Sequence, residues 1–320
     1  MNINTISPED DPRNPSYNYK NIIMDPVENT DLFNSYIKSN SLKQDFKGTI
    51  WGEGPCYIPH KKMLVWSDIP NNRMLKLIDG NVSDFLNPSN FSNGNTLDNN
   101  SNLISCSHGG RCVYKIDDDL NIVTLVSEYN GKKLNSPNDV CVKSDNTIWF
   151  TDPPYGILSD YEGYPGKPEY GGNYVFKYDP DKNILEIVTK ELNRPNGITF
   201  SSNEKKLYIS DTGEGIKHLY VFDIDEKNNI YNKKLVYDFK PYFSDGFRSD
   251  IDGNIWTSAG KAIKCFNKNN ELIGQILVPE LVSNLEFGGT EGNILYITAT
   301  SSLYSIELNQ IGAKYKWVKN

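Results

Sequence analysis

The chain has 320 residues, of which 38% are hydrophobic, 23% charged and 12% aromatic, a composition typical of globular proteins that excludes a disordered or fibrous chain. Its 33 Lys and Arg residues against 41 Asp and Glu leave a formal net charge of −8, which repels a nucleic-acid backbone and disfavours nucleic acid as a partner. No stretch reaches the roughly 20 apolar residues of a membrane helix, and the N-terminal region lacks the basic and apolar segments of a signal peptide. We therefore expect a cytoplasmic protein with no membrane partner.

The N-terminal segment differs from the rest of the chain. Residues 1–45 carry none of the repeated pattern that follows, and apolar residues show helical spacing only weakly, around Leu32 to Leu42. We expect this segment to be a leader that packs on, or closes, a single domain spanning residues 46–320. No linker rich in Gly, Ser or Pro divides that domain.

From Glu53 onward a structural unit recurs along the chain. Each copy begins with an oxygen-bearing side chain, usually followed by Gly, and continues through an apolar strand, a polar turn and a second strand. The first residues of the six copies, called head residues below, are Glu53, Asn93, Asn138, Asn196, Asp245 and Asn284. The second strands end 15, 14, 14, 15, 13 and 14 positions later, and successive heads lie 40, 45, 58, 49 and 39 residues apart. This spacing predicts an all-β, six-bladed β-propeller rather than a two-sheet sandwich.

The repeat predicts that the head residues share one space. In a propeller the innermost strand of each blade runs along the central channel, so the six heads, two carboxylates and four carboxamides, converge there. Buried carboxylates repel one another and lose solvation, and a cation offsets both effects. All-oxygen ligands favour Ca²⁺, with Mg²⁺, Mn²⁺ or Zn²⁺ as alternatives. The competing interpretation is that Asn-Gly and Asp-Gly repeat as tight-turn formers, which applies most to Asn93 and Asn284.

Two segments outside the head positions hold further candidate residues. His108 follows the second unit's inner strands, where it either reaches the channel mouth or remains in a plain loop. Residues 153–172 lie between two strands and contain four Tyr, four Pro and five Gly residues. A loop of this length is either functional or irregular surface structure. It is interpreted as a sugar-stacking lid containing Tyr155, Tyr161, Tyr164 and Tyr170, or as a surface loop stiffened by proline.

A set of short motifs resembles one known family. The motifs are Trp51-Gly52-Glu53-Gly54-Pro55, Trp66-Ser67-Asp68-Ile69-Pro70, Leu134-Asn135-Ser136-Pro137-Asn138-Asp139-Val140, Thr151-Asp152-Pro153-Pro154-Tyr155-Gly156, Arg194-Pro195-Asn196-Gly197 and Asp245-Gly246-Phe247-Arg248. Over about residues 45 to 310 the chain resembles the gluconolactonase and senescence marker protein (regucalcin) family, particularly its bacterial-type sugar lactonases. The resemblance implies a six-bladed propeller with one divalent cation at the axis, held by Glu53, Asn196 and Asp245.

The same resemblance implies roles in catalysis and substrate binding. Asp245 corresponds to the family's catalytic proton donor or acceptor, and Asn138 to an asparagine near the metal that contacts substrate. From the segments near the channel mouth we add His108, Arg111 and Tyr155 as candidate substrate-binding residues. The leading hypothesis is metal-dependent hydrolysis of a sugar lactone, such as glucono-1,5-lactone, to the aldonic acid. The alternatives are a phosphotriesterase-like hydrolase with Asp245 as nucleophile and a non-catalytic calcium-binding propeller.

Overall fold

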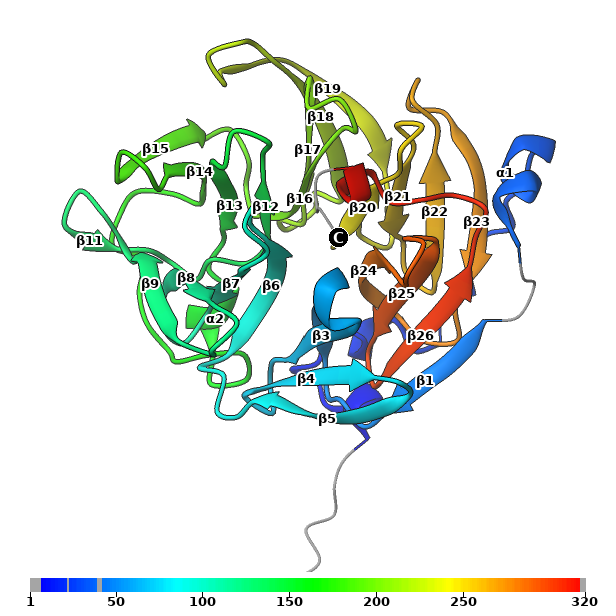
Figure 1. Ribbon diagram of the computed structural model, residues 1–320, viewed down its shortest axis with the longest axis horizontal. Coiled ribbons are helices and arrows are strands. Elements are labelled where there is room, and N and C mark those ends of the chain that lie inside the picture. Colours follow the sequence, from blue (N-terminus) through cyan, green and yellow to red (C-terminus); the bar gives the residue numbers. More distant parts are fainter. Residues whose placement is uncertain (1–6, 22, 39–41, 317–320) are drawn as a thin grey trace, which may run out of the picture.

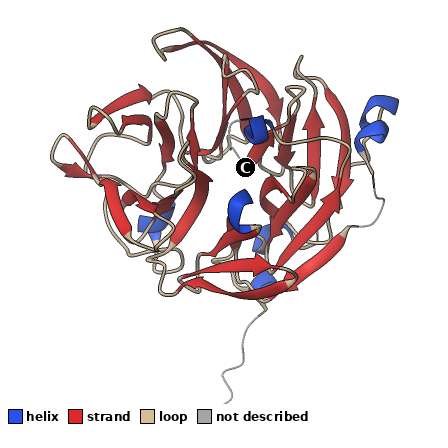
Figure 2. Ribbon diagram, viewed as in Figure 1, coloured by secondary structure: helices blue, strands red, loops and turns tan. Residues whose placement is uncertain are grey.

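Six four-stranded antiparallel sheets surround a central axis in the computed structural model, which describes residues 7–21, 23–38 and 42–316 (Figure 1). The sheets follow one another around the ring in chain order. Strands dominate the described residues, and helices are few and short (Figure 2). The predicted all-β, six-bladed β-propeller is confirmed.

Five blades are each built from four strands that are consecutive along the chain and numbered outward from the channel. Blade one contains β2 (Gly52–Ile58), β3 (Met63–Asp68), β4 (Arg73–Ile78) and β5 (Asn81–Leu86). Blade two contains β6 (Ser92–Leu97), β7 (Leu103–Ser107), β8 (Cys112–Ile116) and β9 (Ile122–Val126). A small hairpin follows, made of β10 (Glu128–Tyr129) and β11 (Lys132–Lys133).

The third to fifth blades repeat this plan. Blade three contains β12 (Val140–Val142), β13 (Ile148–Asp152), β14 (Tyr174–Asp179) and β15 (Ile184–Thr189). Blade four contains β16 (Pro195–Phe200), β17 (Lys206–Asp211), β18 (His218–Ile224) and β19 (Ile230–Asp238). Blade five contains β20 (Phe247–Ser249), β21 (Ile255–Ser258), β22 (Ala262–Phe266) and β23 (Leu272–Leu277).

The sixth blade joins the two ends of the chain. Its three inner strands are β24 (Val282–Gly288), β25 (Ile294–Ala299) and β26 (Ser302–Glu307), and its outer strand is β1 (Lys43–Lys47) from the N-terminal region. β1 runs antiparallel to β26 and covers an edge that would otherwise expose unpaired backbone groups. Residue 45, the boundary expected between leader and domain, lies within β1.

The helical elements lie outside the blades. The leader forms η1 (Pro8–Asp10), η2 (Tyr17–Tyr19) and α1 (Asp31–Tyr36), and the remaining helices are η3 (Pro59–Lys61), α2 (Tyr155–Leu158) and η4 (Ala313–Lys316). α1 packs against blade five, with the rings of Phe33 and Trp256 5.6 Å apart. η4 lies near the centre of the ring in Figure 1, where Lys314 Nζ donates to the Leu97 carbonyl at 2.8 Å. Among the helices of the described residues, none has both the length and the apolar character needed to cross a bilayer.

Apolar side chains fill the spaces between neighbouring blades. Trp66, Trp149 and Trp256 occupy the second strands of blades one, three and five, and all three are fully buried. The five cysteines are buried and unpaired. The hydrophobic core is therefore a ring of clusters around the channel rather than one central core.

The head residues lie where the inner strands depart from regular pairing. The register of β2 against β3 shifts between Glu53 and Cys56, and similar shifts fall at the heads of blades two, four and six. In blades three and five the head lies just before β12 and β20. A break in pairing of this kind re-aims a side chain, so the head residues turn toward the channel instead of packing between blades.

In four of the six blades the head residue is followed by a glycine that permits close contact with the next blade. Gly54 has a φ of +49°, and a Cβ there would lie 2.1 Å from the carbonyl oxygen of Asn93, the next head. At Gly197 a Cβ would lie 1.9 Å from the carbonyl oxygen of Asp245. A hydroxyl of the second strand completes the contact, as where Ser67 Oγ donates to the Asn93 carbonyl at 2.7 Å. The repeated glycine thus lets the blades approach closely around the channel.

Candidate active site

A polar cavity opens where the inner strands begin. It encloses about 230 Å³ of solvent-accessible space. Five of the six head residues line it, namely Glu53, Asn93, Asn138, Asn196 and Asp245. The rest of the wall consists of Pro15, Tyr19, Trp51, Ile69, Tyr155, Glu162, Arg194, Thr212, Lys217 and Phe243. Residues separated by up to about 230 positions in the chain therefore share one space.

Two buried carboxyl groups face each other in this cavity. Glu53 and Asp245 are 4% and 8% exposed. Burial raises the pKa of Glu53 to about 8, and burial together with the nearby charge of Glu53 raises the pKa of Asp245 well above its usual range. Glu53 Oε2 accepts hydrogen bonds from the Gly54 amide at 3.0 Å and from Asn284 Nδ2 at 3.1 Å. Two such groups without a cation between them are electrostatically unfavourable.

The neighbouring carboxamides present oxygen atoms to the same space. Asn196 Oδ1 is buried and has no hydrogen-bond partner, whereas its Nδ2 donates weakly to Thr212 Oγ1 at 3.4 Å. Asn138 lines the cavity, and its carboxamide makes no hydrogen bond to any other described residue. A buried amide oxygen without a hydrogen-bond partner and two carboxylates together form a set of oxygen ligands that suits a hard divalent cation. Glu53, Asn196 and Asp245 therefore fit such an ion.

Two cationic side chains line the cavity as well, although no head residue is basic. Burial lowers the pKa of Lys217, whose Nζ donates to the Thr212 carbonyl at 3.4 Å. The Arg194 guanidinium lies 5.8 Å from the centre of the Tyr155 ring. The Tyr155 hydroxyl forms a 2.5 Å hydrogen bond with Thr212 Oγ1. The wall of the cavity thus combines acidic, amide, basic and aromatic groups.

A family model described as the SMP-30/gluconolactonase/LRE-like region matches residues 51–301. That span includes the first five blades, β24 and β25 of blade six, and every head residue. The chain belongs to this family. The family predicted from the motifs is confirmed.

Relatives of this family member cover most of its length. A gluconolactonase of Zymomonas mobilis is 31% identical over 82% of this chain and 80% of its own. The solved structure of a gluconolactonase of Xanthomonas campestris is 33% identical, with a TM-score of 0.84 over 89% of this chain and 95% of its own. A second solved structure, described as a putative gluconolactonase, is 32% identical, with a TM-score of 0.85 over 92% of this chain and all of its own.

His108 lies behind the cavity wall. Its ring is fully buried and is absent from the residues that line the cavity. Asn93 Nδ2 approaches His108 Nε2 at 3.1 Å, and His108 Nδ1 lies 3.0 Å from the Glu162 carbonyl oxygen. Because an amide nitrogen can only donate, Nε2 accepts and Nδ1 carries the hydrogen. Burial lowers the pKa of this neutral imidazole to about 4, and the ring ties the loop 153–172 to blade two.

Arg111 fastens the same loop from another side. Its Nε donates to the Leu134 carbonyl at 2.6 Å, and its Nη1 lies 3.1 Å from Glu169 Oε1. Like His108, it is not among the residues lining the cavity. Of the three residues added from segments near the channel mouth, the structure brings only Tyr155 into the wall. Substrate contact by His108 and Arg111 remains a prediction.

The four tyrosines of loop 153–172 have different surroundings. Tyr155 lines the cavity. Tyr161 and Tyr170 are 6% and 8% exposed, and the Tyr170 hydroxyl donates to the Asp152 carboxylate. Tyr164 is 56% exposed and packs edge-on against Phe91, the residue just before β6. Only one of the four therefore reaches the cavity.

Sequence reasoning missed Tyr19, Glu162, Arg194 and Lys217 as cavity residues. Tyr19 and Glu162 lie in the leader and in the long loop, where no repeat marks a position. Arg194 stands two residues before the head residue Asn196, so its place in that motif was an available signal. Lys217 follows an irregular turn, and nothing in its sequence context indicates the cavity.

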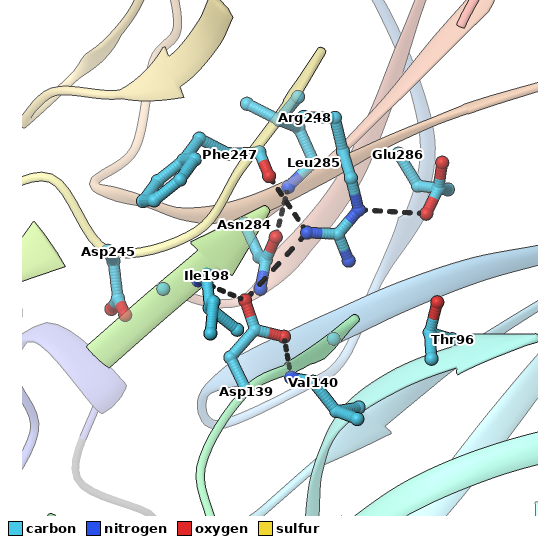
Figure 3. Close-up of polar contacts among 12 residues, drawn as sticks. Thr96, Asp139, Val140, Ile198, Asp245, Phe247, Arg248, Asn284, Leu285 and Glu286 are labelled. Atoms are coloured by element: carbon cyan, nitrogen blue, oxygen red, sulfur yellow. Dashed lines mark hydrogen bonds and ion pairs between the residues drawn. The ribbon is translucent and has the colours of Figure 1, made fainter. Parts of the chain in front are cut away.

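A buried ionic cluster lies beneath the site in the channel. Figure 3 shows Arg248 between Asp139 and Glu286. Its Nε is 2.9 Å from Glu286 Oε2, its Nη1 is 3.8 Å from Asp139 Oδ2, and its Nη2 is buried without a partner. Asp139 Oδ1 accepts the Val140 amide at 2.9 Å. Because Asp139 and Arg248 each lie close in sequence to a head residue, this cluster helps to hold the inner strands in place.

Proposed function

We propose that this chain hydrolyses a sugar lactone, such as glucono-1,5-lactone, to the aldonic acid with the help of one divalent cation. Membership of the lactonase family supports lactone hydrolysis, and the names of relatives support a sugar substrate. They include the Zymomonas mobilis gluconolactonase and a pentonolactonase of Haloferax volcanii, which is 23% identical over 77% of this chain. The cation and its ligands, which the motif resemblance implies, are part of this proposal.

One observation carries the proposal. Glu53 and Asp245 are buried in a shared cavity beside the unpartnered Asn196 Oδ1. In the described part of the chain, no group of three His, Cys, Asp or Glu side chains lies close enough together to bind a metal ion. The proposed ligand set therefore has two carboxylates, and its third oxygen comes from an amide. Ca²⁺ accepts such ligands readily. Glu53, Asn196 and Asp245 would hold it, with Asn138 nearby.

The reaction adds water to the lactone carbonyl carbon and breaks the bond from that carbon to the ring oxygen. A bound cation supplies Lewis-acid polarisation of the lactone carbonyl. Asp245 accepts the proton of the attacking water and returns it to the departing ring oxygen, which becomes a hydroxyl. Asn284 and the Gly54 amide hold the Glu53 carboxylate in position. The hydroxy acid formed then releases its carboxyl proton to solvent, and Arg194 and Lys217 provide positive charge for the resulting anion in the same cavity.

A pH-based assay of gluconolactone hydrolysis tests this function. The protein is first treated with chelator, and Ca²⁺, Mg²⁺, Mn²⁺ and Zn²⁺ are then restored one at a time. We expect activity to return with at least one cation, and Asp245→Asn to lower kcat by about 100-fold or more. Asp160→Asn is the matched control, because the Asp160 side chain is 78% exposed. Full activity in Asp245→Asn with metal still bound would remove Asp245 from the mechanism.

The same preparation separates the two alternative functions. A phosphotriesterase would hydrolyse a fluorophosphate in preference to the lactone, and a nucleophilic Asp245 would acquire labelled oxygen from water during turnover. A non-catalytic propeller would bind Ca²⁺ tightly and hydrolyse neither compound. Each outcome replaces the lactonase proposal with a specific rival.

A further inference from the structure

Two groups in the cavity wall come from segments outside the blades. Tyr19 belongs to η2 of the leader, and Glu162 belongs to loop 153–172. We propose that these two residues select polyhydroxylated lactones: the Glu162 carboxyl group accepts hydrogen bonds from ring hydroxyls, and the Tyr19 ring packs against the C–H face of the sugar. This inference rests on the proposed lactonase function and concerns the substrate class of the same site.

The carboxyl group of Glu162 faces the cavity and has no partner in the described part of the protein, as expected of a group that binds a ligand. It lines the cavity, yet its carboxyl group forms no hydrogen bond or ion pair with any other described residue. Burial raises its pKa to about 7. Glu162 is half-buried, so its carboxyl group is open to the cavity and, having no partner among the described residues, is available to a hydroxyl donor from a ligand. Sugar hydroxyls are donors of this kind.

Glu162 is also distinct from the proposed cation ligands. Its charge contributes to the raised pKa values of Glu53 and Asp245, so the three carboxyl groups share one electrostatic environment. Within the described ranges, however, no three acidic, histidine or cysteine side chains gather closely enough to share an ion. Glu162 therefore lines the same cavity without belonging to the proposed cation set.

The backbone that carries Glu162 is held firmly. Its carbonyl oxygen accepts a hydrogen bond from His108 Nδ1 at 3.0 Å. Next to it, the Tyr164 amide donates to the Gly156 carbonyl at 3.1 Å, and a Cβ at Gly163 would lie 2.1 Å from that same oxygen. A fixed backbone presents the carboxyl group in one place, which is what selective recognition of a hydroxyl requires.

Tyr19 supplies an aromatic surface. Its ring packs edge-on against Phe243 at 5.5 Å, and Pro15, Trp51 and Phe243 line the same cavity. The leader around it is anchored, because Asn14 Nδ2 donates to the Ile50 carbonyl at 3.0 Å. Aromatic rings offer a flat apolar face with little conformational entropy to lose, and the C–H bonds of a pyranose-like ring match such a face.

The two segments also contact each other. The Arg13 guanidinium lies 5.0 Å from the centre of the buried Tyr161 ring, which is the main contact, whereas its 3.8 Å approach to the Asp160 carboxylate is exposed to solvent and contributes little. Arg13 belongs to the leader, and the other two residues belong to the loop. The aromatic and acidic sides of the wall are thus set relative to one another, and the leader forms part of the site.

The test compares two six-membered lactones, gluconolactone and δ-valerolactone, which has the same ring ester and no hydroxyls. Glu162→Ala should raise KM for gluconolactone by about tenfold or more, and Tyr19→Ala by roughly threefold to tenfold. In both variants kcat should change less than KM. The preference for gluconolactone, as a ratio of kcat/KM values, should fall by about tenfold in Glu162→Ala.

Matched controls exist for both positions. Asp160→Ala removes an exposed carboxylate from the same loop, and Tyr17→Ala removes a tyrosine that is 37% exposed from the same short helix. Both should keep the preference of the wild type. Thermal unfolding of each variant in saturating Ca²⁺ shows whether the fold is retained.

A binding measurement separates this inference from the proposed function. Gluconolactam keeps the ring hydroxyls but replaces the ring oxygen with N–H, and calorimetry on Ca²⁺-saturated protein should show weaker binding to Glu162→Ala and Tyr19→Ala. If the wild type binds gluconolactam more tightly than both variants but hydrolyses neither lactone, the role of Glu162 and Tyr19 in selecting the ligand is supported and the lactonase proposal is wrong. If the wild type hydrolyses both lactones equally well, or if the two variants lose activity on both lactones to the same extent, the inferred role of Glu162 and Tyr19 in selectivity is wrong and the lactonase proposal is retained.

Discussion

His108 provides a sharp test, because its predicted effect depends on pH in a direction that the structure determines. Its ring is fully buried and joins Asn93 to the Glu162 carbonyl. In the folded protein burial lowers the pKa of His108 from its ordinary value of 6.5 to about 4. Since tenfold in proton affinity is about 1.4 kcal/mol, this difference in pKa between the folded and unfolded states makes roughly 3 kcal/mol of the unfolding free energy dependent on pH.

The sign follows from which state binds the proton. Below pH 6.5 the unfolded chain protonates His108, whereas the folded protein does so only near pH 4. The contribution is therefore complete above pH 6.5 and is lost as the pH falls from 6.5 to 4. His108→Ala should lower the unfolding free energy at pH 7 by about 3 kcal/mol, through two lost buried hydrogen bonds and a void. At pH 4 the difference between wild type and variant should be close to zero.

Urea unfolding followed by tryptophan fluorescence measures this difference at pH 7, 6, 5 and 4. Chelator is present throughout, so that the carboxyl groups of the site titrate alike in both proteins. Their effect on the unfolding free energy then cancels in the difference between wild type and variant. His60→Ala is the control, because His60 lies at the surface, where its Nε2 is 3.1 Å from Asp118. A gap between wild type and His108→Ala that stays constant from pH 7 to pH 4 would refute the argument that burial keeps this ring neutral.

Three further outcomes are expected. Arg248→Met leaves Glu286 and Asp139 buried without their cation, and should lower the unfolding free energy by about 3–5 kcal/mol; a loss below about 1 kcal/mol in urea unfolding at pH 7 would contradict this. Asn284→Ala removes the 3.1 Å hydrogen bond to Glu53 and should weaken Ca²⁺ binding by roughly tenfold in calorimetry, whereas unchanged affinity would deny it a supporting role. Ca²⁺ at a hundred times its Kd should raise the unfolding free energy by about 2.7 kcal/mol, and a Tm that chelator does not change would argue against a bound cation.

Much of the fold was predictable because the pattern that specifies it is local and repeated. Alternating apolar strands and a head residue followed by Gly mark each blade, and the constant spacing from head to second strand indicates six of them. Symmetry then carries side chains from distant blades to one axis, which is why Glu53, Asn196 and Asp245 could be expected together and do line one cavity. Their shared role in holding a cation remains a prediction.

Residues without a periodic neighbour could not be placed in this way. β1 completes blade six by pairing with a strand about 260 positions away, and nothing in the five residues of Lys43–Lys47 identifies that partner. Glu162 and Tyr19 reach the cavity through contacts of an irregular loop and a leader, which depend on tertiary packing rather than on local pattern. His108 illustrates the same point, because only the loop packed over it decides that it is buried and neutral.

The amino-acid sequence alone thus determined the blades, their number and the ring of oxygen-bearing side chains, since each follows from short-range alternation and a fixed period. Tertiary structure alone decided which groups complete the wall around that ring. The physical reason is that a repeated strand meets its neighbour at the same place in every copy, whereas the position of a non-repeating segment is set by the sum of many long-range contacts.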